Sequence, residues 1–194
     1  MMIKDTINKF ERTILNDMWL GLCPLRKTSS PQKNRPIYNS YMSFYEKLVY
    51  ARKNWFFRKP AYFLLKLLGA EIPSAVVIGP GFLLHHGGMG VVIHPKTVIG
   101  KNVSIYPGVT LGRADIQQPA SASSFEGILI EDQVILGAGS KVLCKRGVLR
   151  VGAGTILGAN AVLLQSTGEN EIWAGIPAHR VGLRKEVIAP ESLS

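Results

Sequence analysis

The stretch "IHPKTVIGKNVSIYPGVTLG", residues 93–112, decides the fold, because an aliphatic side chain returns at every sixth position. These positions are Ile93, Ile99, Ile105 and Leu111. A period of six fits neither the 3.6-residue turn of an α-helix nor the two-residue alternation of a half-buried strand. It fits a β-helix, in which short strands meet at corners and each coil stacks on the preceding one. The aliphatic side chain then points into the coil.

The step of six restarts on both sides of this stretch. It gives Ile72, Ile78 and Leu84 before it, and Ile130, Leu136, Val142, Val151, Leu157 and Leu163 after it. With the four positions above, all thirteen are Ile, Leu or Val. Glycine follows six of them, at Gly79, Gly100, Gly112, Gly137, Gly152 and Gly158. We expect these glycines to relieve the backbone where the chain turns a corner.

The repeat is interrupted three times. The step lengthens to nine, nineteen and nine residues after Leu84, Leu111 and Val142. Interruptions of a regular scaffold form loops, and loops tend to carry function. The first holds the adjacent pair His85 and His86, and the second is the polar loop 113–127. A packed histidine is expected inside the repeat, so this pair is a candidate for chemistry.

Residues 1–70 differ from the rest of the chain in charge. They hold 13 Lys and Arg against 4 Asp and Glu, whereas residues 71–194 hold 10 against 9, within a net charge of +10. A basic segment with many aromatic residues suits an acidic partner such as nucleic acid, an acidic glycan or a membrane surface, and equally a solvated helix face. No nucleic-acid motif accompanies the charge, so we expect no nucleic-acid partner.

Helical spacing of apolar residues replaces the period of six in this N-terminal segment. It predicts a helix over 3–20, and prolines with polar residues predict a loop over 22–37. A second helical region is expected over 41–68, interrupted at Pro60 and closed by Gly69.

The end of that region is "YARKNWFFRKPAYFLLKLLG" (50–69), in which Trp55, Phe56 and Phe57 lie beside Arg52, Lys53, Arg58 and Lys59. We favour docking of this stretch on the β-helix and keep a membrane interface as the alternative. The sequence contains no apolar run of about 18 residues, so we expect no membrane-spanning helix. Its N-terminus contains no apolar core, so we expect no secretion signal. Cys23 and Cys144 lie far apart without zinc-ligand spacing, which fits a reduced cytoplasm and no disulfide scaffold.

The repeat resembles that of the hexapeptide-repeat acyltransferases, and "IWAGIPAHRVG" (172–182) is similar to the Ala-Gly-x-Pro-Ala signature that closes it in that superfamily. The resemblance covers residues 71–182 and implies a left-handed parallel β-helix and a homotrimer. The expected chain is therefore mainly β. It has a helical, basic N-terminal segment (1–70), a β-helix acetyltransferase domain (71–182) and a C-terminal tail (183–194).

Within the superfamily, "LHHGGMG" (84–90) resembles the Asp-His-Ala-Thr-Gly stretch of serine acetyltransferases and related polysaccharide O-acetyltransferases. The match puts His86 at the family's general-base position. A carboxylate fifteen residues earlier orients that base in the family, and Glu71 occupies this position here. The segment "VSIYPGVTLG" (103–112) resembles the family's next segment, and we place its Tyr106 with His85 among the acceptor-binding residues.

The chemistry suits these residue types. A sugar or serine hydroxyl has a pKa far above 7 and needs a base when it attacks, and imidazole titrates near neutrality. A carboxylate on the far ring nitrogen stabilises the imidazolium that forms. We therefore expect direct transfer from acetyl-CoA, with His86 and Glu71 as the catalytic pair. Neither cysteine lies in the first interruption, so no acetyl-enzyme is expected.

Three departures from serine acetyltransferases concern the acceptor. His85 replaces the Asp that helps to hold the ammonium group of serine. The segment "SFEGILI" (124–130) lacks the family's His-Pro-Lys histidine, which meets the serine carboxylate. Only about 70 residues precede the repeat, where serine acetyltransferases carry a long helical domain. Together these departures favour a sugar hydroxyl, to which His85 would hydrogen-bond; a mere spacer role for His85 stays open.

For acetyl-CoA, the resemblance implies backbone groups at coil corners and basic side chains at the phosphates. The predicted cofactor-binding residues are Gly137, Ala138, Gly158, Ala159, Arg113, Arg180 and Lys185. Surface solvation explains the last two equally well, and the corner glycines also have a structural reason. No metal is expected: the four histidines, His85, His86, His94 and His179, do not resemble the three-His site of the γ-type carbonic anhydrases that share the fold.

The sequence therefore predicts a cytoplasmic, acetyl-CoA-dependent O-acetyltransferase that acts on a sugar hydroxyl of a surface or capsular polysaccharide or its precursor. Work at the inner membrane face follows if the basic aromatic stretch meets the membrane. The first alternative is a serine O-acetyltransferase of cysteine biosynthesis. The second is a non-catalytic β-helix scaffold.

Overall fold

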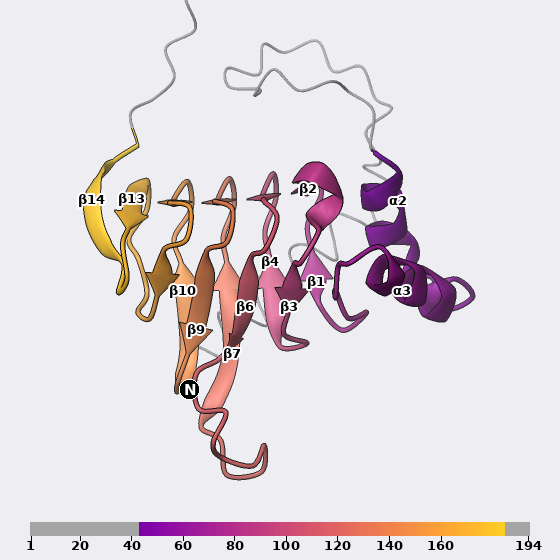
Figure 1. Cartoon of the computed structure of the whole chain (residues 1–194), viewed down its shortest axis with the longest axis horizontal. Coiled ribbons are helices and arrows are strands. Elements are labelled where there is room, and N and C mark those ends of the chain that lie inside the picture. Colours follow the sequence, from indigo (N-terminus) through magenta and orange to yellow (C-terminus); the bar gives the residue numbers. More distant parts are fainter. Residues whose placement is uncertain (1–42, 185–194) are drawn as a thin grey trace, which may run out of the picture.

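The computed structural model describes residues 43–184 of the 194-residue chain. These residues form a left-handed parallel β-helix with two α-helices at its N-terminal end (Figure 1). The helix predicted over 3–20, Cys23 and Lys185 lie outside the described residues. Within the described part, no helix is long and apolar enough to cross a membrane.

Three sheets form the sides of the β-helix. The first contains β1 (Val77–Ile78), β4 (Thr97–Ile99), β7 (Phe125–Ile130) and β10 (Gly147–Val151). The second contains β2 (Leu83–Leu84), β5 (Ser104–Ile105), β8 (Ile135–Leu136), β11 (Ile156–Leu157), β13 (Glu171–Ala174) and β14 (His179–Leu183). The third contains β3 (Val92–Ile93), β6 (Thr110–Arg113), β9 (Lys141–Cys144) and β12 (Val162–Leu163). All neighbours pair in parallel except β13 and β14, which close the last coil as an antiparallel pair.

The predicted repeat positions are the interior of this prism. Ile78 pairs with Ile99 and then Ile130 along the first sheet, and the other two sheets show the same stacking of aliphatic positions. All thirteen positions are at most 4% exposed. Each strand therefore buries one aliphatic side chain per coil, which confirms the hexapeptide prediction.

The glycines that follow these positions were expected to relieve the backbone at the corners, but the structure gives a different explanation for them. Left-handed backbone falls elsewhere: at the corner between the first and second sheets, the positive-φ residues are Gly81, Asn102, Gln133, Gly154 and Asn170. Gly79 and Gly137 instead allow the next coil to approach closely. A Cβ on Gly79 would lie 2.7 Å from the Gly100 carbonyl oxygen, and one on Gly137 would lie 2.7 Å from that of Leu157.

The helices differ from the prediction in where they break. Helix α2 (Phe44–Ala51) begins at a capping box formed by Ser43 and Glu46, and α3 (Arg58–Leu67) follows after a short turn. Pro60 therefore lies in the first turn of α3 and does not interrupt a helix. A proline is tolerated there because the first N–H groups of a helix have no partner within it. Gly69 closes α3 with φ +91°, as predicted.

Side chains of α2 and the turn after it cap the first coil. The Tyr50 hydroxyl donates to the Gly79 carbonyl at 2.7 Å, and Lys53 Nζ donates to that of Ile78 at 3.0 Å. The fully buried Arg52 donates to the carbonyls of Pro73 and Val76. An open sheet edge would leave such groups unpaired and invite another strand. The helical segment thus closes the N-terminal edge of the solenoid.

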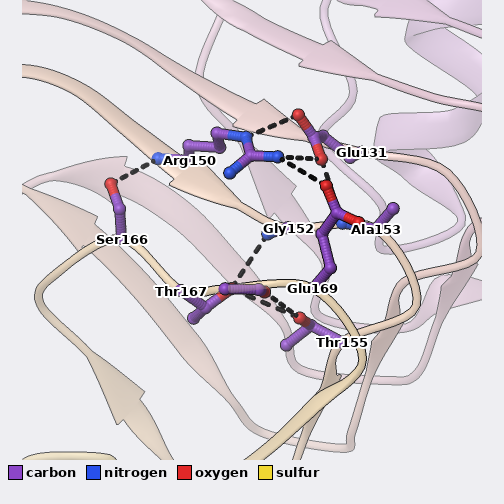
Figure 2. A network of polar contacts seen from close by, with 9 residues as sticks. Glu131, Arg150, Gly152, Ala153, Thr155, Ser166, Thr167 and Glu169 are labelled. Atoms are coloured by element: carbon purple, nitrogen blue, oxygen red, sulfur yellow. Dashed lines mark hydrogen bonds and ion pairs between the residues drawn. The ribbon is translucent and has the colours of Figure 1, made fainter.

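A polar network ties neighbouring coils together at the corner between the first and second sheets (Figure 2). Both side-chain oxygens of Glu131 accept hydrogen bonds from Arg150, at 2.6 and 2.7 Å. One of these oxygens also accepts the Ala153 N–H, and Thr167 Oγ1 accepts the Gly152 N–H at 2.9 Å. The Arg150 pKa is raised, mainly by its hydrogen bond to Glu131.

We predict that Gly79→Ala destabilises the protein by about 2 kcal/mol, lowering Tm by about 5 °C, because the added methyl meets the next coil's backbone. Gly112→Ala is the matched control, since its Cβ would find its nearest neighbour, Leu143, at an ordinary 3.8 Å. Thermal unfolding of both variants checks this, and equal Tm values would contradict the close-approach explanation.

Candidate active site

The first interruption of the repeat forms a tight turn, η1 (His85–Gly88), between β2 and β3. His86 adopts left-handed backbone with φ 52° and ψ 34°, and its side chain is exposed. Non-glycine residues rarely adopt this conformation, and such strained positions cluster at functional sites. Gly87 follows because a Cβ there would meet the ring of Tyr45 on α2 at 2.6 Å. Within residues 43–184, His86 has no hydrogen-bond or ion-pair partner.

Helix α2 packs against this turn through residues that were not among the predicted site residues. Glu46 is 6% exposed, and its Oε1 accepts the Leu84 N–H at 3.2 Å. Its Oε2 accepts the Ser43 N–H at 2.8 Å, so one carboxylate joins the start of α2 to the residue before the histidines. The Ser-x-x-Glu pattern at 43–46 signals a helix start. No local pattern signals the contact with Leu84, which lies 38 residues away.

The two predicted acceptor-binding residues lie together. The rings of His85 and Tyr106 are stacked, with centroids 4.1 Å apart and planes 11° apart. The register explains this, because His85 follows Leu84 in β2 just as Tyr106 follows Ile105 in the paired β5. Burial lowers the pKa of His85, and the neighbouring charge of His86 adds to this, while Glu46 opposes it. The His85 imidazole is therefore held toward its neutral form.

The same register places the predicted corner residues in one column with these rings. Gly137 and Gly158 follow the paired Leu136 and Leu157, at the corner where His85 begins the column. Coils stack at about 4.8 Å, so Gly158 lies three coils and about 14 Å from His85. The N–H groups of Ala138 and Ala159, next along the corner, donate to no acceptor within residues 43–184. An extended ligand along this corner would meet these donors.

Within residues 43–184, no hydrogen bond or ion pair joins Glu71 to His86. Its carboxylate lies 3.4 Å from the hydroxyl of Tyr62 and 3.4 Å from Nζ of Lys66, both on α3. Its backbone bridges to Val92, next to the third sheet, so the side chain lies on the face that α3 covers. The Glu71–His86 hydrogen bond therefore stays a prediction that the described contacts do not include.

Arg113 is the last residue of β6, at a different corner of the prism, and it holds the loop 113–127. Its Nε lies 2.9 Å from Asp115 Oδ1, and its Nη2 donates to the carbonyls of Asp115 and Gln118. Asp115 is 2% exposed and also accepts from the Ser123 hydroxyl at 2.6 Å. Within one chain, these contacts commit the guanidinium to the loop and do not bring it to His86.

Three further basic residues, Lys145, Arg146 and Arg180, lie away from the histidine turn. An open cavity of about 520 Å³ separates the loop 113–127 from the turn after β9, and its lining includes Lys145 and Arg146. Arg180, on β14, is 56% exposed and lies 3.7 Å from Glu171. The ion pair accounts for Arg180 structurally, and its predicted role at a phosphate stays a prediction.

His94 occupies the corner next to the loop. Its Nδ1 accepts the Lys96 N–H at 3.1 Å, and its ring packs edge-on against Phe125 at 4.7 Å. Burial lowers its pKa, and the charges of Lys96 and Arg113 add to this. Among the described residues, no three His, Cys, Asp or Glu side chains are grouped to hold a metal ion. Cys144 is a buried free thiol whose pKa is raised by burial.

Comparison with known proteins points to serine acetyltransferases. A serine acetyltransferase of Staphylococcus aureus (strain Mu50) is 39% identical over 113 residues, which are 58% of this chain and 49% of that protein. The crystal structure of the enzyme from Brucella abortus strain S19 in complex with coenzyme A has a TM-score of 0.54 at 27% identity. That match covers 73% of this chain and 54% of the other. The enzyme from Neisseria gonorrhoeae in complex with serine gives 0.58 at 26% identity, covering 71% and 55%.

The chain spans about half the length of the curated relatives it matches. No sequence profile of a protein family matches the chain. The likeness supports a hexapeptide-repeat acetyltransferase. It does not show the closer kinship with polysaccharide O-acetyltransferases expected from the sequence, and it favours the serine acetyltransferase alternative.

We predict that His94 makes stability fall in mild acid. The pKa of His94 in the folded protein lies below the ordinary 6.5. Between these two values the unfolded chain therefore binds more protons than the folded one, and the free energy of unfolding decreases as the pH is lowered. His94→Asn, whose Oδ1 can still accept the Lys96 N–H, should flatten the fall of Tm below pH 7. Lys96→Met should flatten it in part by removing one of the opposing charges. An unchanged slope in both variants would exclude His94 as the source.

Proposed function

We propose that this protein is an acetyl-CoA-dependent O-acetyltransferase with His86 as its general base. The observation that carries the proposal is an exposed imidazole on a strained turn, at the start of a corner column with unused N–H donors. The similarity of residues 43–184 to serine acetyltransferases, one of them bound to coenzyme A, supports it. The corner residues Gly137, Ala138, Gly158 and Ala159 would then line the path of the pantetheine arm.

In the proposed reaction, His86 removes the proton of the acceptor hydroxyl as its oxygen attacks the thioester carbonyl. A C–O bond forms, the C–S bond breaks, and the imidazolium returns the proton to the departing CoA thiolate. A backbone N–H holds the oxyanion meanwhile. The carboxylate of Glu71 would stabilise the imidazolium after turning from Lys66 toward His86.

L-Serine is the acceptor that the comparisons favour, because the similar enzymes are serine acetyltransferases and one is bound to serine. A sugar hydroxyl of a surface or capsular polysaccharide is the second candidate. The observation that favours it is the His85–Tyr106 stack, in which an imidazole and a phenol offer hydrogen bonds but no carboxylate for an ammonium group. Glu46 is nearby, but both of its oxygens are bound to backbone N–H groups.

We further propose a homotrimer that works in the cytoplasm. The family resemblance of the repeat supports the trimer. The buried free thiol of Cys144 is compatible with a reducing compartment.

The first test is release of CoA thiol from acetyl-CoA, with L-serine in one series and de-O-acetylated glycans or free sugars in another. His86→Ala should lower kcat by about 10²–10⁴-fold while leaving the CoA Kd unchanged. Turnover with serine alone supports the serine candidate, and turnover with a sugar alone supports the glycan candidate. Release with neither acceptor would overturn the proposal in favour of a non-catalytic β-helix.

A second test concerns the catalytic pair. Glu71→Gln should lower kcat at least about tenfold with little change in Tm, because the carboxylate is only half-buried. Lys66→Gln is the matched control: it removes the ion-pair partner and leaves the carboxylate in place. A Glu71→Gln enzyme that keeps wild-type kcat would show that Glu71 serves only α3.

A further inference from the structure

The turn before α3 and the outer side of α3 expose an unusual set of apolar side chains. We call it the aromatic ridge; it consists of Trp55, Phe56, Phe57, Phe63 and Leu67, which are 82, 75, 56, 68 and 73% exposed. The three consecutive aromatic rings contact one another edge-on, at 5.6 and 6.4 Å between centroids. Soluble proteins expose single apolar residues freely, but a group of large exposed side chains that includes three rings in contact indicates an interaction surface.

The docking expected from the sequence accounts for only one side of this segment. Ala61 and Leu65 of α3 are buried, with only 4% and 0% of their surface exposed. Tyr50 and Arg52 donate hydrogen bonds to the first coil. Phe63 and Leu67 lie four residues apart on the opposite side of α3. The helix therefore has two apolar sides, and docking on the β-helix covers one of them.

Positive charge surrounds the ridge. Residues 44–68 hold six Lys and Arg against one acidic residue, the buried Glu46. Arg58 and Lys59 adjoin the rings and are exposed, and neither has a carboxylate partner within residues 43–184. Aromatic residues next to Lys and Arg are the composition that settles at the headgroup level of a bilayer, and anionic headgroups attract each nearby cation.

The ridge lies at the same end of the molecule as the histidine turn. Helices α2 and α3 lie at the N-terminal end of the solenoid, and β13 and β14 lie at the far end (Figure 1). Helix α2 contacts the turn directly, through the Tyr45 ring against Gly87 and through Glu46 against Leu84. A surface that binds the ridge would therefore lie at the same end of the molecule as His86.

We infer that the aromatic ridge and its flanking cations bind the surface of an anionic phospholipid bilayer. The charge complementarity of Arg58 and Lys59 selects a lipid surface over an apolar protein partner. The lipid binding does not depend on the proposed function. Combined with that function, the binding places the acceptor site at the end of the molecule that faces the membrane. Of the two candidate acceptors, the sugar hydroxyl suits this position when it is carried on a lipid-linked glycan.

The test is flotation of the full-length chain with vesicles of phosphatidylcholine alone or with phosphatidylglycerol added. We expect at least tenfold more binding to the anionic vesicles, and loss of that excess at high salt. Trp55→Ser/Phe56→Ser/Phe57→Ser should abolish binding, and Arg58→Glu/Lys59→Glu should lower it at least tenfold. Ile116→Ser is the matched control, since Ile116 is 83% exposed on the loop 113–127 and away from the ridge.

The oligomeric mass of each variant, measured by light scattering, separates a lipid surface from a second copy of the chain. Absence of wild-type binding to anionic vesicles would overturn the inference. Unchanged binding by the ridge variant, or a change of its mass alone, would also overturn it. His86→Ala should bind vesicles as the wild type does, so loss of catalysis and loss of lipid binding are read separately.

Discussion

The stacking of one coil on the next is the constraint on which the rest of the structure depends. Parallel pairing holds neighbouring coils at about 4.8 Å, so any side chain between them must fit that spacing. Ile99, between Ile78 and Ile130, satisfies it on the inside by burying one aliphatic group per rung. Gly79 satisfies it at a corner, where a methyl group would meet the Gly100 carbonyl. The same stacking brings side chains from distant parts of the sequence into columns, and the candidate site is one of these columns.

A stack of coils must also begin somewhere, and here the beginning and the candidate site share one element. Helix α2 satisfies the first coil's carbonyls through Tyr50 and supports the histidine turn through Glu46. The Glu46 carboxylate is buried, so its two hydrogen bonds to backbone N–H groups fix it more firmly than an exposed ion pair would. The strained backbone of His86 can persist because this helix and the first coil determine its surroundings together. The same helix thus closes the end of the solenoid and positions His86.

What the sequence could predict follows the distance over which each signal acts. The period of six is a local signal, and all thirteen positions that it predicted are buried, whereas Trp173, which continues the column of Leu157, falls outside the period. The His85–Tyr106 stack also follows from it, since both residues come directly after paired repeat positions. The Glu46–Leu84 contact has no such signal, because helix docking across 38 residues leaves no periodic trace. Arg113 shows another limit: its predicted contact with the thioester end or the phosphates of acetyl-CoA stays a prediction, and no period signalled its ion pair with Asp115, two residues away in the loop.

The positions of the corners decide which parts of the candidate site the proposed trimer could bring together. A triangular coil has three corners, and the histidine turn lies at the one between the second and third sheets. The loop 113–127, with Arg113 at its base, projects from the corner between the third and first sheets, on the other side of the prism (Figure 1). In this structure the loop and the histidine turn of one chain therefore lie at different corners, and Arg113 is bound within its own loop. If the loop takes part in binding the acceptor or acetyl-CoA, it does so across a subunit interface, where a neighbouring chain presents it to the column of His85 and Tyr106.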